Sequence, residues 1–338
     1  MKKVLVTGGA GFIGSALVKQ LAADPTRQIL VLDALTYAAQ PASLAACLEQ
    51  AAVELVVGDI CDGPMLAQLF ARFQPDTVFH LAAESHVDRS IAGPAAFIQT
   101  NIVGTFELLE AARLYWQQRP SNTDFCFFHV STDEVYGDLA GSEHMATEQH
   151  GYAPSSPYSA AKASSDHLVH AWHRTYGLPV MMSHCSNNYG PWQYPEKLIP
   201  LLVTKALAGE PLPIYGDGLQ QRDWLHVDDH VAALLWIRQH GQIGERYNIG
   251  ADNPRTNLDL VTQICRYLDL QLAEKPSGIA SFTTLITHVP DRLGHDRRYA
   301  IDSQKLRQLG WKPRIAWDDG IASTIEFYLQ RQQREDNA

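Results

Sequence analysis

Thr7-Gly8-Gly9-Ala10-Gly11-Phe12-Ile13-Gly14 joins a short apolar run, residues 4–6, to a helical pattern over residues 12–23. Its glycines are spaced G-x-x-G-x-x-G. Gly8 permits a tight turn, Gly11 lets the backbone approach a pyrophosphate, and Gly14 allows close packing of helix on strand. The helix N-terminus adds free N–H groups and the positive end of a dipole. The strand, glycine turn and helix together predict a dinucleotide-binding unit rather than a turn without a ligand.

Asp33 ends the second apolar run, 19 residues after Gly14. A carboxylate at this point can accept hydrogen bonds from the ribose hydroxyls of a dinucleotide, and it would repel a 2′-phosphate. Residues 34–37 contain no Lys or Arg, so the sequence predicts NAD rather than NADP. Asp59-Ile60, after the third strand, and residues 81–83, after the fourth, fit further contacts, with plain strand ends as the alternative.

Apolar runs alternate with helical patterns through the first half of the chain. This alternation predicts a Rossmann-type, doubly wound α/β fold whose parallel sheet is covered on both faces. After residue 185, prolines divide the chain into shorter pieces, which predicts a smaller, interleaved C-terminal α/β domain. We expect a dinucleotide-binding domain at 1–185, joined by some later segments, a substrate-binding domain at 186–330, and a frayed polar tail at 331–338. The predicted strands lie at 4–6, 29–32, 53–57, 77–81, 125–130 and 179–184, and the predicted helices at 12–23, 94–117, 157–176, 197–208, 227–239, 256–268 and 317–332.

The composition is that of a soluble globular protein, since the 338 residues are 46% hydrophobic and 19% charged. The formal net charge of −10 argues against nucleic-acid or anionic-membrane partners. No apolar stretch is long enough for a membrane span or a signal peptide. Five isolated cysteines without a C-x-x-C pair favour a reducing setting, so we expect a cytoplasmic protein.

Two groups of residues carry acid–base potential. Tyr158 and Lys162 open a helical pattern at i and i+4, so they share one helix face. A cation beside a phenol favours the phenolate, which would let Tyr158 act as a base near neutral pH. Asp133 and Glu134 directly follow an apolar strand, at the edge of a parallel sheet where ligands bind. Two neighbouring carboxyl groups in a partly closed site can hold different protonation states.

Together these motifs resemble the extended short-chain dehydrogenase/reductase family, and within it the nucleotide-sugar 4,6-dehydratases. The resemblance runs nearly end to end. Sister epimerases usually lack the Asp-Glu pair, so Asp133 and Glu134 favour dehydration. The most specific stretches are residues 83–90, 131–137, 158–173, 187–190, 195–200, 222–224 and 294–299.

The resemblance implies a lyase of deoxysugar biosynthesis that turns dTDP-glucose into a 4-keto-6-deoxy sugar nucleotide and recycles its bound NAD. Tyr158, helped by Lys162, would take the proton of the 4-hydroxyl, which Thr132 orients. Glu134 would remove the C5 proton, and Asp133 would protonate the departing 6-hydroxyl. The cofactor would then reduce C6.

Binding residues also follow from the resemblance. For the substrate they are Ser85, Thr132, Asn187, Lys197, Leu198, Pro213, Ile214, Tyr215, Arg222, Asn257, Asp291, Arg292 and His295, with Lys197, Arg222 and Arg292 supplying positive charge for the diphosphate. For NAD they are Gly8, Gly11, Phe12, Ile13, Gly14, Asp33, Ala34, Leu35, Thr36, Asp59, Ile60, Leu81, Ala82, Ala83, Ser85, Thr100, Tyr158, Lys162 and Asn188.

Departures from the family pattern keep alternatives open. Ala34 replaces a frequent Lys, Trp192 and Tyr194 replace Tyr and Phe, and Pro290 and Leu293 alter a loop beside the expected nucleotide pocket. A dehydratase or epimerase acting on a UDP-, GDP- or CDP-sugar is therefore the second reading, and a non-catalytic NAD-binding scaffold is a third. By the same resemblance we expect a homodimer through helices 94–117 and 157–176. The histidines at 167, 170 and 173 do not share one helix face, so we expect no metal site.

Overall fold

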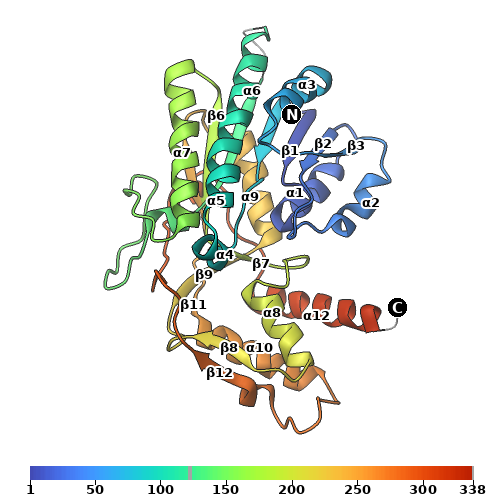
Figure 1. The fold of residues 1–338 in the computed structure, drawn as a ribbon, viewed down its shortest axis with the longest axis vertical. Coiled ribbons are helices and arrows are strands. Elements are labelled where there is room, and N and C mark those ends of the chain that lie inside the picture. Colours follow the sequence, from blue (N-terminus) through green and yellow to red (C-terminus); the bar gives the residue numbers. More distant parts are fainter. Residues whose placement is uncertain (121–123, 337–338) are drawn as a thin grey trace.

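The computed structural model describes residues 1–120 and 124–336, and its larger part is a parallel sheet with helices on both faces (Figure 1). The seven strands lie in the order β10-β6-β5-β4-β1-β2-β3, and every neighbouring pair is parallel. This confirms the predicted fold class. The strands are β1 Lys3–Thr7, β2 Gln28–Asp33, β3 Val53–Val57, β4 Thr77–His80, β5 Cys126–Thr132, β6 Val180–Cys185 and β10 Arg246–Ile249.

Strand residues of alternating direction build two cores, one on each face of the sheet. From β1, Val4 and Val6 pack with helices α1 and α9 on one face. Leu5, between them, packs with helices α3, α6 and α7 on the other. The sheet is therefore buried on both sides, which explains its continuous apolar strands. The covering helices are α1 Phe12–Ala22, α2 Ala45–Leu48, α3 Gly63–Phe73, α6 Thr105–Gln117, α7 Pro157–Tyr176, α9 Val227–His240 and α11 Gln304–Gln308.

The helix expected over residues 94–117 is not one regular α-helix. Helix α4, Val87–Ala92, is followed by the short α5, Ala95–Phe97, a π-helical stretch over Ile98–Gly104, and then α6. In the π-helical stretch the Asn101 side chain is buried and bonds both backbone groups of Glu84, with its Oδ1 accepting at 2.8 Å and its Nδ2 donating at 3.0 Å. The wider π-helical turn lets the buried Asn101 side chain bind the segment that follows β4. The spacing of apolar residues in the sequence does not predict such a turn.

The smaller part lies beyond the carboxyl ends of the large sheet (Figure 1). It contains a three-stranded sheet in the order β11-β9-β7 and a two-stranded parallel pair, β12-β8. Its elements are β7 Asn187–Tyr189, α8 Leu198–Leu207, β8 Leu212–Tyr215, β9 Gln221–His226, β11 Pro254–Thr256, α10 Asn257–Gln271, a 3₁₀ turn at Phe282–Leu285, β12 Ile286–Val289 and α12 Trp317–Asp336. The larger part contains two further 3₁₀ turns, at Pro41–Leu44 and Asp133–Tyr136.

The C-terminal tail differs from expectation. Residues 331–336 continue helix α12 instead of fraying, and Arg331 donates a hydrogen bond to Gln40 Oε1 at 2.6 Å. Arg331 also lies 5.4 Å from the centroid of the Trp192 ring. These long-range contacts stabilise the last turns of a polar helix. Residues 337–338 lie outside the described part.

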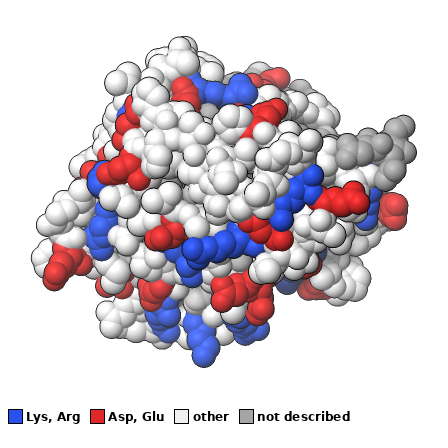
Figure 2. Space-filling model, turned by 90° about the horizontal axis from the view of Figure 1, so that it is seen from below, with Lys and Arg blue, Asp and Glu red and all other residues white. Residues whose placement is uncertain are grey.

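No helix within the described residues is long and apolar enough to cross a membrane. Basic and acidic side chains alternate on the face shown in Figure 2, so neither sign of charge covers it. That face presents no broad basic surface of the kind that binds a nucleic-acid backbone.

Candidate active site

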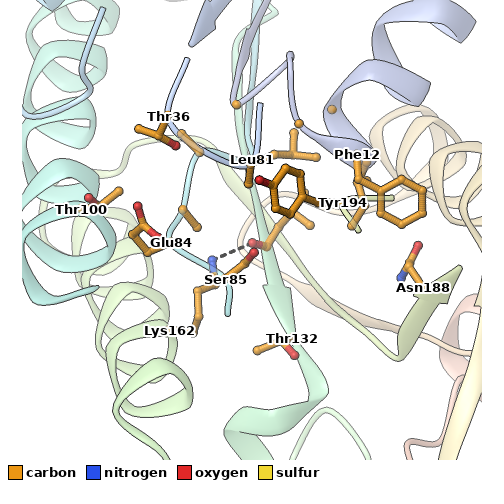
Figure 3. Close-up of a pocket in the computed structure, with 18 of the residues that line it drawn as sticks. Phe12, Thr36, Leu81, Glu84, Ser85, Thr100, Thr132, Lys162, Asn188 and Tyr194 are labelled. Carbon is orange, nitrogen blue, oxygen red and sulfur yellow. Dashed lines mark hydrogen bonds between the residues drawn. The ribbon is translucent and has the colours of Figure 1, made fainter. Parts of the chain in front are cut away.

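A cavity of about 350 Å³ opens at the carboxyl ends of the parallel strands, between the large sheet and the smaller part (Figure 3). The glycine turn forms one wall. Gly8 adopts φ +70°, and a Cβ on Gly14 would overlap the Gly8 carbonyl oxygen. The lack of side chains therefore brings helix α1 directly against the turn, so that backbone N–H groups border the cavity.

Asp33 lies at the end of β2 with its carboxylate oriented by backbone groups. Ala10 N donates to Oδ2 at 2.8 Å, and Leu35 N donates to Oδ1 at 2.9 Å. Burial raises the pKa of this carboxyl group, and the two hydrogen bonds oppose the rise. Each oxygen retains a further acceptor position, so the glycine turn and Asp33 together fit the pyrophosphate and ribose of a dinucleotide.

Of the residues predicted for the cofactor, Leu35 does not line the cavity. Its backbone adopts φ +49°, and its side chain packs against the apolar core beside helix α1. It contributes through its backbone N–H to Asp33 instead. The other predicted residues all line the cavity, namely Gly8, Gly11, Phe12, Ile13, Gly14, Asp33, Ala34, Thr36, Asp59, Ile60, Leu81, Ala82, Ala83, Ser85, Thr100, Tyr158, Lys162 and Asn188.

Tyr158 and Lys162 enter the same cavity from the first two turns of helix α7. A capping box at Ser156 and Ser159 and a proline in the first turn begin this helix beside the cavity. The Lys162 ammonium donates to Val130 O at 2.8 Å, which ties the helix to strand β5.

The pKa of Tyr158 runs opposite to expectation. Burial raises it well above the ordinary value, and the charge of Glu134 raises it further. Burial lowers the pKa of Lys162, and the charge of Asp166 opposes that change. The expected phenolate is therefore not favoured by this protein environment alone, because Tyr158 is desolvated and lies near a carboxyl group.

Asp133 and Glu134 begin a 3₁₀ turn at the end of β5, and the side chain of Thr132 caps it by accepting from Glu134 N at 3.3 Å. Burial raises the pKa of Asp133 well above its ordinary value, and the Glu134 charge adds to this. Burial also raises the pKa of Glu134, but Arg222, Arg292 and Lys197 oppose the rise. Asp133 is therefore the group that holds a proton more readily, and Glu134 is the more easily ionised. Within the described residues, Asp133 Oδ2 has no hydrogen-bond partner.

Comparisons with known proteins agree with this geometry. A family model described as GDP-mannose 4,6 dehydratase matches residues 5–324. The chain belongs to this family. The dTDP-glucose 4,6-dehydratase of Neisseria gonorrhoeae is 54% identical over 340 residues, covering 100% of this chain and 98% of the relative. The dTDP-glucose 4,6-dehydratase 1 of Escherichia coli K12 is 54% identical, with 99% and 95% covered.

Solved structures agree with the family. DesIV, a dTDP-glucose 4,6-dehydratase from Streptomyces venezuelae with NAD bound, superposes with a TM-score of 0.89 at 42% identity, covering 98% of each chain. The UDP-glucose 4-epimerase of Thermotoga maritima reaches 0.84 at 29% identity, with 98% of this chain and 99% of that chain covered. The predicted resemblance to the extended short-chain dehydrogenase/reductases is confirmed.

The substrate residues that the family resemblance predicts fall into two sets. Ser85, Thr132, Asn187 and Lys197 line the cavity, and Lys197 donates to Ser85 O at 2.8 Å. The remaining residues do not line it, namely Leu198, Pro213, Ile214, Tyr215, Arg222, Asn257, Asp291, Arg292 and His295.

Several members of the second set form an adjoining polar cluster in this family member. Tyr215 OH donates to Asp88 Oδ2 at 3.4 Å, and an Arg292 nitrogen lies 3.6 Å from Asp88 Oδ1. His295 lies 2.6 Å from an oxygen of Asp291. Arg222 and Arg292 act on Glu134 through their charge, so the cluster stands next to the acid pair although it is outside the main cavity.

Sequence reasoning missed part of the cavity wall. The Glu196 carboxylate pairs with Arg89 at 3.0 Å, and Arg89 lies 3.7 Å from the centroid of the Tyr37 ring. Tyr37 in turn lies edge-on to Tyr194, at 5.7 Å between centroids. In the sequence, Pro191 and Pro195 indicate a loop over residues 191–195. No local pattern predicts that this loop packs against the loop that carries Tyr37. The missed lining residues are Leu32, Ala38, Ala39, Gly58, Val130, Ser131, Ser186, Gln193, Tyr194 and Glu196.

Proposed function

We propose that this protein is a dTDP-glucose 4,6-dehydratase that retains NAD and releases a 4-keto-6-deoxy sugar nucleotide and water. One observation carries the proposal: Thr132, the acid pair Asp133-Glu134, and the pair Tyr158-Lys162 line a single cavity with the glycine turn. An acid pair beside a tyrosine–lysine pair provides for elimination as well as oxidation. The names and full-length similarity of the relatives support the substrate.

NAD, which the glycine turn and Asp33 would hold, would supply reversible oxidation by accepting a hydride from C4 and giving it back to C6, and its oxidised form would add positive charge to the cavity that Tyr158 lines. Tyr158 takes the proton of the 4-hydroxyl, and Thr132 orients that hydroxyl. A ketone at C4 makes the C5 proton acidic, so a carboxylate can remove it. Glu134 removes this proton, Asp133 gives a proton to the departing 6-hydroxyl, and water leaves. Return of the hydride to C6 and of a proton to C5 would then give the 4-keto-6-deoxy sugar.

The electrostatics of the acid pair support this division of roles. Glu134 faces the charges of Arg222, Arg292 and Lys197, which favour its ionised form. Asp133 is more deeply buried than Glu134, and the negative charge of Glu134 raises its pKa further. Both effects favour the protonated form of Asp133. The three basic side chains also provide the local positive charge that a diphosphate needs on an acidic protein.

We place NAD in the domain at 1–185 and the sugar nucleotide against residues 186–330. The exclusion of NADP follows from Asp33, whose carboxylate would face a 2′-phosphate. A dissociation constant for NADP equal to or below that for NAD would contradict this assignment. We also propose a homodimer through the outer faces of α6 and α7.

The second candidate is a dehydratase for another nucleotide sugar. Pro290 and Leu293 favour it, since they depart from the family pattern in the loop that also carries Asp291 and Arg292 of the adjoining polar cluster, and Leu293 is 77% exposed. A change there would affect which base is accepted and leave the acid pair and Tyr158 unaltered.

The deciding experiment is incubation of the purified protein with dTDP-glucose, without added cofactor, followed by mass spectrometry. Loss of one water with a 4-keto chromophore in alkali supports dehydration and retained NAD together. No water loss even after NAD is added rejects dTDP-glucose as substrate. UDP-, GDP- and CDP-glucose assayed in parallel then test the second candidate.

A further inference from the structure

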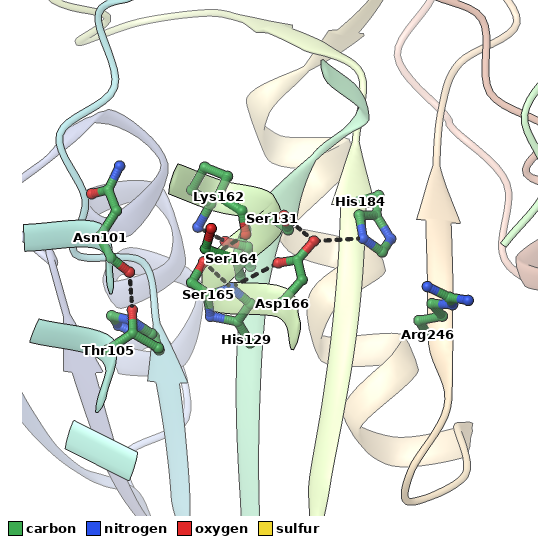
Figure 4. Close-up of polar contacts among 12 residues, drawn as sticks. Asn101, Thr105, His129, Ser131, Lys162, Ser164, Ser165, Asp166, His184 and Arg246 are labelled. Carbon is green, nitrogen blue, oxygen red and sulfur yellow. Dashed lines mark hydrogen bonds and ion pairs between the residues drawn. The ribbon is translucent and has the colours of Figure 1, made fainter. Parts of the chain in front are cut away.

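Asp166 is a buried carboxylate below the cavity that the proposed reaction does not use. Asp166 is 2% exposed and meets four polar side chains from three segments, of which Figure 4 shows His129, Ser131 and His184. On β5, His129 Nε2 donates to Oδ1 at 3.1 Å and Ser131 Oγ donates to Oδ2 at 2.9 Å. On β6, His184 Nε2 lies 3.0 Å from Oδ2. In the loop that precedes α7, Tyr152 OH donates to Oδ2 at 3.0 Å.

These contacts keep Asp166 ionised in spite of its burial. The hydrogen bonds from His129 and His184 hold its pKa far below the ordinary range, against desolvation. An isolated buried carboxylate would be strongly unfavourable, so a carboxylate surrounded by donors is a stable fixed charge. Burial lowers the pKa of His129 to about 4, and its Nε2 is the protonated nitrogen because it donates to Asp166.

The position of this charge links it to the catalytic pair. Tyr158, Lys162 and Asp166 follow one another at intervals of four on helix α7, so they lie along one face of the helix. Lys162 donates to Val130 O, and Val130 stands on β5 between the two Asp166 partners, His129 and Ser131. Two successive turns of α7 are thus joined to the same four-residue stretch of β5, which ends in Thr132.

We propose, on the basis of the dehydratase function above, that Asp166 is a positioning residue: it fixes Tyr158 and Lys162 relative to Thr132, and its negative charge supports the protonated form of Lys162. Helix α7 carries the tyrosine and the lysine, whereas β5 carries Thr132 and the acid pair. Asp166 joins these two elements and also binds β6. A small shift of α7 along β5 would misplace Tyr158 relative to the 4-hydroxyl that Thr132 orients.

The charges around Lys162 make the electrostatic part testable. The charge of Asp166 raises the pKa of the buried Lys162, and that of Cys185 acts in the same direction. The other titratable groups around the two side chains are Tyr158 and His167 on α7, His80 on β4, His129 and Asp133 at β5, His184 on β6, Tyr152 in the preceding loop and Arg246 on β10. Of these, His80 and His129 are neutral at pH 7 because burial lowers the pKa of each.

The test is the pH profile of kcat for Asp166→Asn. Removing the negative charge of Asp166 lowers the pKa of every nearby titratable group. The acidic and the basic limb of the pH profile of kcat should therefore both move to lower pH. We expect the optimum to shift by about half a unit to one unit, with kcat about ten-fold lower and KM within two-fold of wild type. The matched control is Asp229→Asn, since Asp229 is also buried, accepts from two backbone N–H groups, those of Arg314 and Ile315, and is not among the groups whose charge changes the pKa of Lys162. The control should lose stability without a shift in the optimum.

A folded Asp166→Asn variant with an unshifted optimum would overturn the inference and leave Asp166 purely structural. Where this variant does not fold, Tyr152→Phe removes one hydrogen bond from Asp166 and leaves its charge. If the inference is right, Tyr152→Phe lowers kcat several-fold and leaves KM and the pH optimum unchanged. An unaltered kcat in Tyr152→Phe overturns the inference. A wild-type protein that forms no 4-keto product instead overturns the proposed function, so the two failures are distinguishable.

Discussion

Asp133 and Glu134 are neighbours in the chain, yet their carboxyl groups face different surroundings. Asp133 is 3% exposed and raised in pKa by burial and by Glu134, whereas Glu134 faces three basic side chains. The residue pair was predictable from its place after an apolar strand. Its division of roles depends on Arg222, Arg292 and Lys197, which come from distant parts of the chain.

Glu134→Gln tests the base. Glutamine keeps the shape and removes the carboxylate, so turnover of dTDP-glucose should fall by about 10²- to 10⁴-fold, the usual contribution of a general base. NAD binding should persist, because the dinucleotide contacts lie elsewhere. The measurement is exchange of the C5 hydrogen with solvent deuterium alongside product formation. Glu143→Gln, at an exposed site, is the matched control, and an unchanged rate in Glu134→Gln would remove Glu134 from this role.

His230 tests the pH dependence of stability. Burial lowers the pKa of this fully buried imidazole to about 3, against about 6.5 in an unfolded chain. Below pH 6.5 the unfolded state therefore binds a proton that the folded state does not, so stability is complete above that pH and declines as the pH falls toward 3. The slope is at most about 1.4 kcal/mol per pH unit for one such group.

Denaturant unfolding at pH 7, 6 and 5 measures this decline. His230→Gln should show a shallower loss of unfolding free energy with acidification than the wild type, whatever its stability at pH 7. His144→Gln, which alters an exposed histidine, should keep the wild-type slope. Equal slopes in all three proteins would argue against a neutral buried His230.

The element that positions the dinucleotide is the β1–α1 turn. Its geometry is local, because Gly8 O accepts from Gly11 N at 3.1 Å and Gly11 O accepts from Ser15 N at 2.9 Å. The spacing of the glycines therefore predicted the turn correctly. The π-helical stretch at 98–104 was not predictable in this way, since its shape depends on the bonds between Asn101 and Glu84.

Gly14→Ala tests this element. The added Cβ would overlap the Gly8 carbonyl oxygen, so the helix must shift away from the turn. We expect a loss of about 1–3 kcal/mol in unfolding free energy and at least ten-fold weaker NAD binding, measured by calorimetry. Gly151→Ala is the control, because a Cβ there meets nothing within 4 Å. Wild-type NAD affinity in Gly14→Ala would show that the close packing is dispensable.

Across the whole molecule, α6 and α7 pack side by side and carry an outer apolar face. Trp172 Nε1 donates to Glu110 Oε1 at 2.7 Å, and the Trp172 and Phe106 rings meet at 5.9 Å. On α6 Phe106 is 39% exposed and Leu114 49% exposed, and on α7 Tyr176 is 44% exposed. Apolar residues exposed on adjacent helices suit a helical interface between two copies of the chain.

Sedimentation at micromolar concentration checks the dimer. The wild type should sediment as a dimer, and the double variant Phe106→Glu, Leu114→Glu should sediment as a monomer, because four charges would be buried in a symmetric interface. Leu270→Glu is the control, since this side chain is 84% exposed on α10 and lies outside the proposed interface. A monomeric wild type would contradict the proposal.

The sequence alone determined the features that depend on neighbouring residues. The glycine spacing, Asp33, the i, i+4 pair Tyr158-Lys162 and the alternation of strands and helices are short-range patterns, and backbone geometry converts each into one local structure. The family could also be recognised from the sequence, because each of its motifs is a short run of neighbouring residues and such motifs occur along the whole chain.

Only the tertiary structure decided which distant groups meet. Leu35 turns into the core through a positive φ, helix α12 continues to Asp336 through contacts of Arg331, and Asp166 gathers partners from β5, β6 and the loop at Tyr152. These results depend on burial and on charges that face each other across the fold. Desolvation and Coulomb interactions act through space, so no spacing along the chain reports them.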